Sequence, residues 1–179
     1  MASSGQVGRL KRLKGGYVIR KSKTEDIPVV TDIATRAFSK IYDALEKIYG
    51  QELFPVLIPD RKTAKIEQIT AHALNHPEWI FICEEDGKIV GVITFSLNHQ
   101  LRIGTIGNNA VDPDCGLKGI GQQMYKAVLK YFKENGMDFA EVTTGMDASH
   151  EPARRAYERA GFNIRMEYVT YYRNLKDNA

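Results

Sequence analysis

The sequence predicts a single α/β domain, and three observations support this fold class. The chain has 179 residues, which is enough for one domain with its own apolar core. Two strand-like runs, 79–84 and 88–95, are joined through Asp86-Gly87, a pair typical of a tight antiparallel hairpin. Residues 101–132 then run from a β-prone segment through a glycine-rich loop into a helical pattern. A hairpin beside a strand–loop–helix unit indicates a sheet covered by helices.

The N-terminal third is expected to contribute one strand and one well-defined helix. Residues 17–20 are apolar and β-prone, which predicts a short strand. Thr24 or Asp26 can cap the helix that follows, and Pro28 is tolerated in its first turn. The buried face of this helix is predicted to consist of Val30, Ile33, Ala34, Ala37, Phe38 and Ile41.

Residues 42–60 mix a helical pattern with Gly50, Pro55 and Pro59. We therefore expect broken helices or a mobile connection in this region. Residues 61–74 predict a second helix, which ends shortly before a proline.

The C-terminal half is predicted to alternate strands and helices. The strand at 101–111 ends in the polar run Gly107–Ala110, which suggests a bulge where strand pairing is interrupted. The elements expected after it are a helix at 119–135, a strand at 139–144, a loop at 145–149, a helix at 151–160 and a strand-like run at 162–173 centred on Tyr168–Tyr172.

Composition places the chain among ordinary globular proteins, with 43% apolar and 26% charged residues. No apolar run approaches the roughly 20 residues of a membrane span, so no membrane association is expected. The N-terminus lacks the apolar core of a secretion signal, and we expect a cytoplasmic protein. Cys83 and Cys115 lack the paired spacing of a disulfide framework or a zinc site, so no metal is expected. Cys83 is interpreted as a small buried apolar residue.

Basic residues are concentrated near the N-terminus, although the net charge is only +3. Residues 1–16 are interpreted as a basic, disordered arm that precedes a domain at 17–175. Such an arm could lead a nucleic-acid-binding module, which is a competing function. Because Tyr17 is the only aromatic residue near this run, base stacking is poorly supported and a nucleic-acid partner is not expected.

The loop at 111–121 is the feature with the clearest chemical meaning. Its glycines allow backbone angles that a Cβ atom forbids, and the helix after it has unpaired N–H groups in its first turn. Such groups, aided by the helix dipole, bind phosphate. The glycine spacing fits neither the P-loop nor the dinucleotide-binding fingerprint. A glycine-rich turn without a ligand is the plain alternative.

Two segments in the C-terminal part of the chain match the motifs of one protein family. The first, 111–121, reads V-x-P followed by G-x-G, and the second, 150–162, reads A-x-x-x-Y-x-x-x-G-F. The matching residues are Val111, Pro113, Gly119, Gly121, Ala153, Tyr157, Gly161 and Phe162.

In these motifs, their order and their spacing, the chain resembles the GCN5-related N-acetyltransferase (GNAT) superfamily. The first segment resembles the family's acyl-CoA-binding motif, with Lys118 where a basic residue is common. Gly116 and Leu117 depart from it, because the family usually has Gln or Arg and then glycine at these positions. In the second segment His150 replaces the usual Asn.

The resemblance implies a GNAT-type domain: a mixed, mostly antiparallel central sheet with a parallel splayed strand pair and helices on both faces. The strands 101–111 and 139–144 would form this pair and receive the pantetheine arm of the cofactor between them. The implied reaction transfers an acetyl group from acetyl-CoA to a primary amine by direct attack in a ternary complex. The acceptor would be a small-molecule or peptidyl amine, and the resemblance also raises a homodimer through the C-terminal strands.

The resemblance also assigns the cofactor site. Backbone N–H groups of Leu117 to Gln122 would bind the diphosphate, and an N–H at Ala110 or Val111 would polarise the thioester carbonyl. The complete expected cofactor-binding set is Ala110, Val111, Gly116, Leu117, Lys118, Gly119, Ile120, Gly121, Gln122, His150, Arg154 and Tyr157.

Three residues are expected to take part in catalysis. By resemblance Tyr157 protonates the departing thiolate, and its spacing places it on one helical face with Ala153 and Gly161. Asn109 lies near the position where many relatives carry a carboxylate, and its amide can orient a substrate or a water but cannot act as a base. His150 can titrate near neutrality and serve as the base.

The base nevertheless stays open at the level of sequence. His150 could instead bond the cofactor, or cap a helix together with Asp147. Asp147, His99 and Glu84 are the other candidates for the base.

A non-catalytic acyl-CoA-binding or sensing domain is the main alternative function. It is favoured by Gly116 and Leu117 in the loop and by the missing carboxylate. The resemblance places the acceptor pocket in the region 42–60, where the aromatic candidates are Tyr42, Tyr49 and Phe54, and packing in the core is the equal alternative for each of them.

Overall fold

Five strands form the central sheet in the structure, a computed structural model that describes residues 16–176. In the sheet they follow the order of the sequence, antiparallel from β1 to β4 and parallel between β4 and β5. This is the mixed, mostly antiparallel sheet that was expected. Of the predicted basic arm, residues 1–15 lie outside the described part of the chain. The strands are β1 (Val18–Lys21), β2 (Ile80–Glu85), β3 (Lys88–Asn98), β4 (Ile103–Val111) and β5 (Phe139–Val142).

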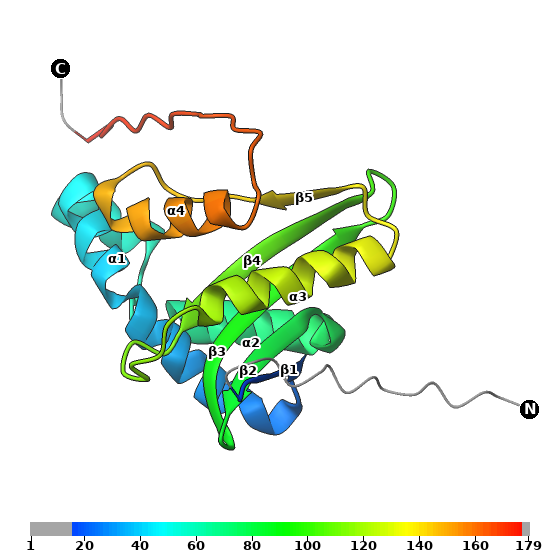
Figure 1. Cartoon of the computed structure of the whole chain (residues 1–179). Helices are drawn as coiled ribbons and strands as arrows, with labels where there is room; N and C mark the ends of the chain where they lie inside the picture. The colour runs from blue at the N-terminus through cyan, green and yellow to red at the C-terminus, as the bar shows by residue number, and fades with distance from the viewer. Residues whose placement is uncertain (1–15, 177–179) are drawn as a thin grey trace, which may run out of the picture.

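Helices cover both faces of this sheet, α1 and α2 on one face and α3 and α4 on the other (Figure 1). The predicted elements are present with ends shifted by a few residues, except for the final strand-like run. The helices are α1 (Ile27–Leu57), α2 (Ala64–Asn75), α3 (Ile120–Glu134) and α4 (Glu151–Arg159), and short 3₁₀ turns are η1 (Thr24–Asp26), η2 (Pro77–Trp79) and η3 (Ala148–His150).

Helix α1 has the predicted inner face and is interrupted near its end. Val30, Ile33 and Ala34 are fully buried against the sheet. At Gly50 the backbone leaves the helical region, with φ 72° and ψ 174°, so two helical segments meet at a kink. A positive φ is accessible to glycine at little cost. The prediction of broken helices in 42–60 is therefore confirmed, and Tyr42 and Phe54 from this region are buried.

The two faces have different cores. Aromatic rings dominate under α3, where Phe95 packs edge-on against Phe132 at 5.6 Å between ring centroids. Under α1 and α2 the core is aliphatic and includes Ile69 and Ile82. Cys83 belongs to the first core, and burial raises the pKa of its thiol to about 11. Its interpretation as a buried apolar residue is confirmed.

Strand β4 carries the predicted bulge. Asn109 pairs with Ile93, but Ile106 pairs with Phe95, so Gly107 and Asn108 together oppose one residue of β3. A Cβ atom at Gly107 would lie 2.7 Å from Thr94 Oγ1, which explains the glycine. Pairing between β4 and β5 ends at Ile106 and Val142, so β4 continues beyond the last paired residue. The parallel splayed pair is present.

The strand predicted at Tyr168–Tyr172 is wrong. This segment has no regular secondary structure and runs as an extended trace along the upper side of the molecule (Figure 1). The sequence pattern favours a strand, but a strand also needs a hydrogen-bonding partner, and none within residues 16–176 pairs with it. Its end is held instead at α1, where Tyr172 contacts Tyr49 at 5.8 Å between ring centroids and Asn174 donates to Glu52 over 2.8 Å.

Candidate active site

Tyr157 and Asn109 meet beside the point where β4 and β5 separate. Asn109 Nδ2 donates a hydrogen bond of 3.0 Å to Tyr157 Oη, and Tyr125 Oη donates one of 2.8 Å to Asn109 Oδ1. An amide nitrogen can only donate, so Tyr157 Oη is the acceptor and its own proton is free for another acceptor. The amide therefore orients Tyr157 as a proton donor.

Burial keeps both tyrosines in the protonated form. Tyr157 is 7% exposed, and burial raises its pKa above the ordinary value, although hydrogen bonds with Asn109 and Tyr125 act in the opposite direction. Burial also raises the pKa of Tyr125, with a further contribution from Tyr157. A hydroxyl that stays protonated at neutral pH is what a proton donor requires.

The glycine-rich loop presents its backbone to solvent. Gly116 and Gly119 have positive φ values of 66° and 83°, and Gly119 is the N-cap of α3. The side chains of Leu117 and Ile120 pack into the core, while Lys118 is exposed. The first N–H groups of α3 have no carbonyl four residues earlier in the helix to bind. An anion can therefore reach them from the solvent side.

A cation that sequence reasoning missed fastens this loop to α1. Arg36 donates from one terminal nitrogen to Asp112 and Asp114, both at 2.7 Å, and from Nε to Asp32 at 2.9 Å. The hydrogen bond from Arg36 holds the pKa of Asp112 below its usual range. Arg36 is 76 residues away from Asp112 in sequence, so no local motif could reveal the contact.

The loop before α4 is organised around Asp147. Its carboxylate accepts from Ser149 N at 2.9 Å and lies 2.5 Å from His150 Nδ1. Asp147 thus caps the 3₁₀ turn η3, whereas α4 itself, with His150 as its N-cap residue, has no side-chain cap. Burial raises the pKa of Asp147, but the hydrogen bonds from Ser149 and His150 outweigh it, so the net pKa is lowered. Asp147 is consequently a charged anchor and a weak base.

The packing around Gly145 fixes this anchor in place. A Cβ atom at Gly145 would lie 2.6 Å from both Asp147 Oδ2 and His150 Nδ1. Arg154 donates from NH1 to the carbonyl of Gly145 at 2.6 Å and to that of Asp147 at 2.9 Å. These two hydrogen bonds from Arg154 hold the loop. The neighbouring Arg155 is exposed and pairs with Glu151.

Two other candidates for the base lie away from the tyrosine pair. Glu84 is on β2 and accepts from Arg20 Nε at 3.0 Å. His99 is exposed in the turn after β3, at the end of β4 opposite to the splayed residues. Neither side chain lies on β4 or β5, the strands of the splayed pair.

Further contacts join the elements of the site, and they too come from tertiary packing. Gln122 Nε2 donates to the carbonyl of Ala156 at 2.8 Å, which ties α3 to α4 beside Tyr157. Glu141 of β5 is the only carboxylate on β4 and β5, and it accepts from Thr105 Oγ1 at 3.2 Å. Sequence reasoning overlooked Glu141 and Tyr125, although both lie on elements that it had placed next to the site.

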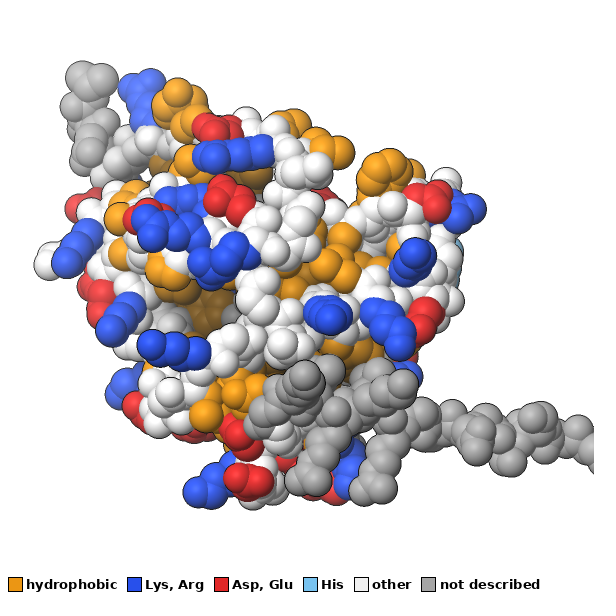
Figure 2. All heavy atoms as spheres, viewed as in Figure 1, with side chains coloured by type: hydrophobic (Ala, Val, Ile, Leu, Met, Phe, Trp, Pro, Cys, Tyr) orange, Lys and Arg blue, Asp and Glu red, His pale blue; other side chains and the backbone are white. Residues whose placement is uncertain are grey.

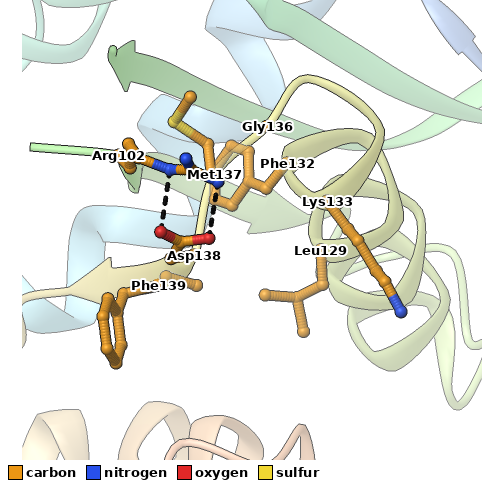
Figure 3. Close-up of a pocket in the computed structure, with 9 residues that line it drawn as sticks. Arg102, Leu129, Phe132, Lys133, Gly136, Met137, Asp138 and Phe139 are labelled. Carbon is orange, nitrogen blue, oxygen red and sulfur yellow. Dashed lines mark hydrogen bonds and ion pairs between the residues drawn. The ribbon is translucent and has the colours of Figure 1, made fainter. Parts of the chain in front are cut away.

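A hollow of about 430 Å³ lies at the far end of α3, away from the glycine-rich loop. Figure 3 shows its lining, in which Arg102 faces Asp138 and the apolar residues Leu129 and Phe139 border the open space.

Residues 16–176 contain no group of three or more His, Cys, Asp or Glu arranged to hold a metal. In the same range, no helix combines the length and the apolarity needed to cross a membrane.

Two curated proteins of Methanocaldococcus jannaschii, both named as uncharacterised N-acetyltransferases, are similar in sequence. The first is 30% identical over 101 residues, which make up 54% of this chain. The match covers only 44% of the length of that relative. The second is 25% identical over 160 residues, which cover 89% of this chain and 86% of that protein.

Solved structures share the fold. The PaiA N-acetyltransferase of Thermoplasma acidophilum, crystallised with coenzyme A, superimposes with a TM-score of 0.62 at 16% identity. The match covers 83% of this chain and 91% of that one. Residues 38–162, more than half of the chain, match the model of the acetyltransferase (GNAT) family. The chain therefore belongs to the acetyltransferase (GNAT) family of enzymes.

Proposed function

We propose that this protein transfers the acetyl group of acetyl-CoA to a primary amine, by direct attack of the amine on the thioester within a ternary complex. The observation that carries the proposal is the hydrogen bond from Asn109 to Tyr157, because it leaves the tyrosine proton free at the splayed strand pair. Membership of the acetyltransferase family supports acyl transfer as the reaction. The acceptor is a small-molecule or peptidyl amine.

In the proposed step the amine nitrogen bonds to the thioester carbon while the C–S bond breaks. The carbonyl oxygen gains negative charge, which an N–H at Ala110 or Val111 stabilises. The departing sulfur takes the proton of Tyr157, which regains it from solvent. His150 and Glu141 are the proposed acceptors for the proton that the amine loses, directly or through water. Because Asp147 occupies His150 Nδ1, only Nε2 of His150 is available for this role.

The diphosphate of the cofactor is proposed to bind the backbone N–H groups of residues 117–122. Lys118, exposed beside them, adds a positive charge. His150 and Arg154 are proposed to contact the cofactor from the loop before α4. Arg154 uses one nitrogen to hold that loop, and its other guanidinium N–H groups supply the donors for a phosphate or carbonyl oxygen.

The direct test mixes the protein with acetyl-CoA and a panel of amines that includes polyamines, amino acids, aminoglycosides and peptides with free amines. We expect free thiol to be released with at least one acceptor class and the acetylated amine to be found by mass spectrometry. Binding of coenzyme A by calorimetry without thiol release for any amine would support the alternative, a non-catalytic acyl-CoA-binding domain. Absence of binding at millimolar coenzyme A would remove the cofactor site itself.

A glycine pair separates loop function from folding. Gly119→Ala places a Cβ atom on a positive φ of 83° in the phosphate loop, and Gly87→Ala does the same at 76° in the β2–β3 hairpin. Both have open space for the added atom, so the backbone strain is matched. We expect both to lose similar stability, about 1 kcal/mol, and only Gly119→Ala to weaken coenzyme A binding. Equal affinities would argue against the loop as the diphosphate site.

We also propose a homodimer in which residues 162–175 of one copy cover the open edge of β5 in another. Strand β5 is the last strand of the sheet, so its outer edge has no partner among the described residues. The C-terminal segment carries large exposed apolar side chains, and apolar surface is visible along this upper side in Figure 2. An unpaired strand edge and an unpaired strand-forming segment in the same chain complement each other between two copies. The exposed side chains are Ile164, Met166, Tyr168, Val169, Tyr171, Tyr172 and Leu175.

Light scattering after gel filtration tests the dimer. We expect the full chain to be dimeric and a variant ending at residue 162 to be monomeric. A second variant, Met166→Lys with Val169→Lys, keeps the segment but charges its apolar side and is expected to dissociate the dimer. A monomeric full chain at high micromolar concentration contradicts this part of the proposal. Because acetyl-CoA is a cofactor of the cell interior, a cytoplasmic location belongs to the same proposal.

A further inference from the structure

Lys65 is a buried lysine with no carboxylate partner. It lies in the first turn of α2 and is 8% exposed. Its Nζ donates to Asn108 Oδ1 at 2.7 Å and to Gln68 Oε1 at 2.9 Å. The same nitrogen lies 3.9 Å from the centroid of the Phe38 ring. Three neutral groups thus surround the ammonium, and its charge is not balanced by an anion.

A buried cation without a counter-ion is costly, because its hydration is lost and no opposite charge compensates. Burial lowers the pKa of Lys65 to about 8, so the side chain is still mostly protonated at neutral pH. A methionine or leucine at this position would fill similar space without the electrostatic penalty. The charge itself is therefore the property that calls for an explanation.

The charge lies beside the proposed reaction centre. Asn108 is one of the two bulge residues of β4, beyond the last pair with β5. Its carbonyl accepts from Thr94 Oγ1 at 3.3 Å, so both ends of the residue are held. The next residue is Asn109, which bonds Tyr157 on the other face of the sheet. Lys65 thus fixes the segment of β4 that carries Asn109. Its positive charge is hydrogen-bonded to Asn108, the residue that directly precedes Asn109.

The groups around Lys65 leave this charge unopposed. The contacts that α1, α2 and β4 make with its ammonium come from Phe38, Gln68 and Asn108, none of which titrates. On α1, Asp43 and Glu46 are paired with Arg61. Other titratable groups on these elements and on β5 include the exposed Glu67, His72, whose pKa burial lowers, the buried Tyr42, whose pKa burial raises, and Glu141, which accepts from Thr105.

We propose that Lys65 is a positioning residue of the acetyl transfer, which acts without touching the substrate: its charge favours the neutral, attacking form of the bound amine and stabilises the negative charge that develops on the thioester oxygen. A nearby positive charge lowers the pKa of an ammonium group, because it disfavours the charged form. The same charge favours an oxyanion in a site from which water is excluded. This inference rests on the proposed amine acetyltransferase function. In it, the positive charge of Lys65 contributes to deprotonation of the amine, which would otherwise depend on the general base alone.

The test compares the pH dependence of kcat/KM for wild type, Lys65→Met and Lys65→Arg with one amine acceptor. In Lys65→Met we expect the rising limb to move up by about one pH unit and kcat at pH 7.5 to fall about tenfold, because the amine is no longer biased toward its neutral form. The KM for the amine is expected to fall as well, since the ammonium form is no longer repelled. A structural defect at the site would raise KM instead.

Lys65→Arg supplies the second, independent readout. Arginine stays charged throughout the accessible pH range. This variant should therefore keep the rising limb and lack the decline that we expect for wild type above about pH 8, where Lys65 releases its proton. Lys62→Met removes an exposed positive charge from the same region and is the matched control, with an unchanged profile. If Lys65→Met does not fold, the high-pH limb of Lys65→Arg against wild type decides the question.

The outcomes separate this inference from the proposed function. Wild type that releases no thiol with any acceptor overturns both. Active wild type, together with a Lys65→Met variant that has lower activity but the same pH profile and a higher KM, overturns only the electrostatic role and leaves a structural one. Identical high-pH limbs in wild type and Lys65→Arg also overturn it.

Discussion

The two faces of the sheet use the same residue type for different ends. Asn108 and Asn109 are consecutive on β4, and successive side chains of a strand point to opposite faces. Asn109 reaches the aromatic side under α3 and α4, where it holds two tyrosine hydroxyls. Asn108 reaches the aliphatic side under α1 and α2, where it accepts from a buried lysine. On one face Asn109 thus orients the proton donor Tyr157, and on the other Asn108 accepts from the positively charged Lys65.

The largest effect is expected on the aromatic face, from Tyr157→Phe. Removal of the hydroxyl leaves the thiolate without its donor, and we expect kcat to fall by about 100-fold or more with little change in the KM for acetyl-CoA. Tyr125→Phe is the comparison on the same face, because it removes the hydroxyl that donates to Asn109 and keeps that of Tyr157. Steady-state thiol release measures both. Equal activity of Tyr157→Phe and wild type would show that another group protonates the thiolate.

The packing of the aromatic face can be tested with Gly104→Ala. The added Cβ atom would lie 2.4 Å from the Phe132 ring, a rigid group in a filled core. We expect a loss of about 3 kcal/mol in unfolding free energy, measured by urea denaturation. Gly91→Ala is the matched control, because its Cβ would meet the flexible Met124 side chain at 3.0 Å and Ile120 Cγ2 at 3.1 Å, both longer than the Phe132 contact, and it should cost about 1 kcal/mol. A larger loss for Gly91→Ala would contradict this view of the core.

On the opposite face, the contribution of Lys65 to the unfolding free energy should depend on pH in a predictable direction. Burial lowers the folded-state pKa from 10.5 to about 8, so between these values the unfolded chain binds more protons than the folded one. Wild type should therefore gain stability relative to Lys65→Met as the pH rises from about 8 toward 10.5, by about 2 kcal/mol. Denaturation at several pH values measures the difference. A constant difference across this range would show that Lys65 is not desolvated.

The smallest effect should distinguish the two amides directly. Asn109→Ala frees Tyr157 from its orienting bond, and we expect kcat to fall about tenfold. Asn108→Ala leaves Tyr157 in place and removes one acceptor from Lys65, so we expect a loss of about 1 to 3 kcal/mol in stability and a smaller loss of kcat. For each variant, the measurement is the ratio of the loss in kcat to the loss in unfolding free energy. If the ratios are the same, the two faces are not separable.

The features that could be predicted from the sequence are those encoded locally. The glycines of the phosphate loop and the spacing from Ala153 to Gly161 lie within short segments, and the polar run before Ala110 marked the bulge. The contacts of Arg36, Tyr125 and Lys65 join residues 16 to 78 positions apart, and only the packed fold brings them together. No periodicity in the sequence carries that information.

The C-terminal run shows the complementary difficulty. Its alternation of apolar and polar residues has the period of a strand, but hydrogen-bonded pairing depends on a neighbour, and the pattern of one segment does not specify whether a neighbour is present. His150 is similar. Its chemistry suggests a base, but the sequence does not show that Asp147 binds Nδ1 and leaves only Nε2 available, because that contact depends on the tight turn at Gly145.

The fastening of the glycine-rich loop to α1 has a consequence for how these two parts of the molecule can move. Arg36 stands on the helix whose distal half was expected to shape the acceptor pocket, and it binds two carboxylates of the glycine-rich loop, those of Asp112 and Asp114. A displacement of this part of α1 must either carry that segment along or separate the guanidinium from its partners. The glycine-rich loop and α1 are thereby held to each other through a single arginine side chain.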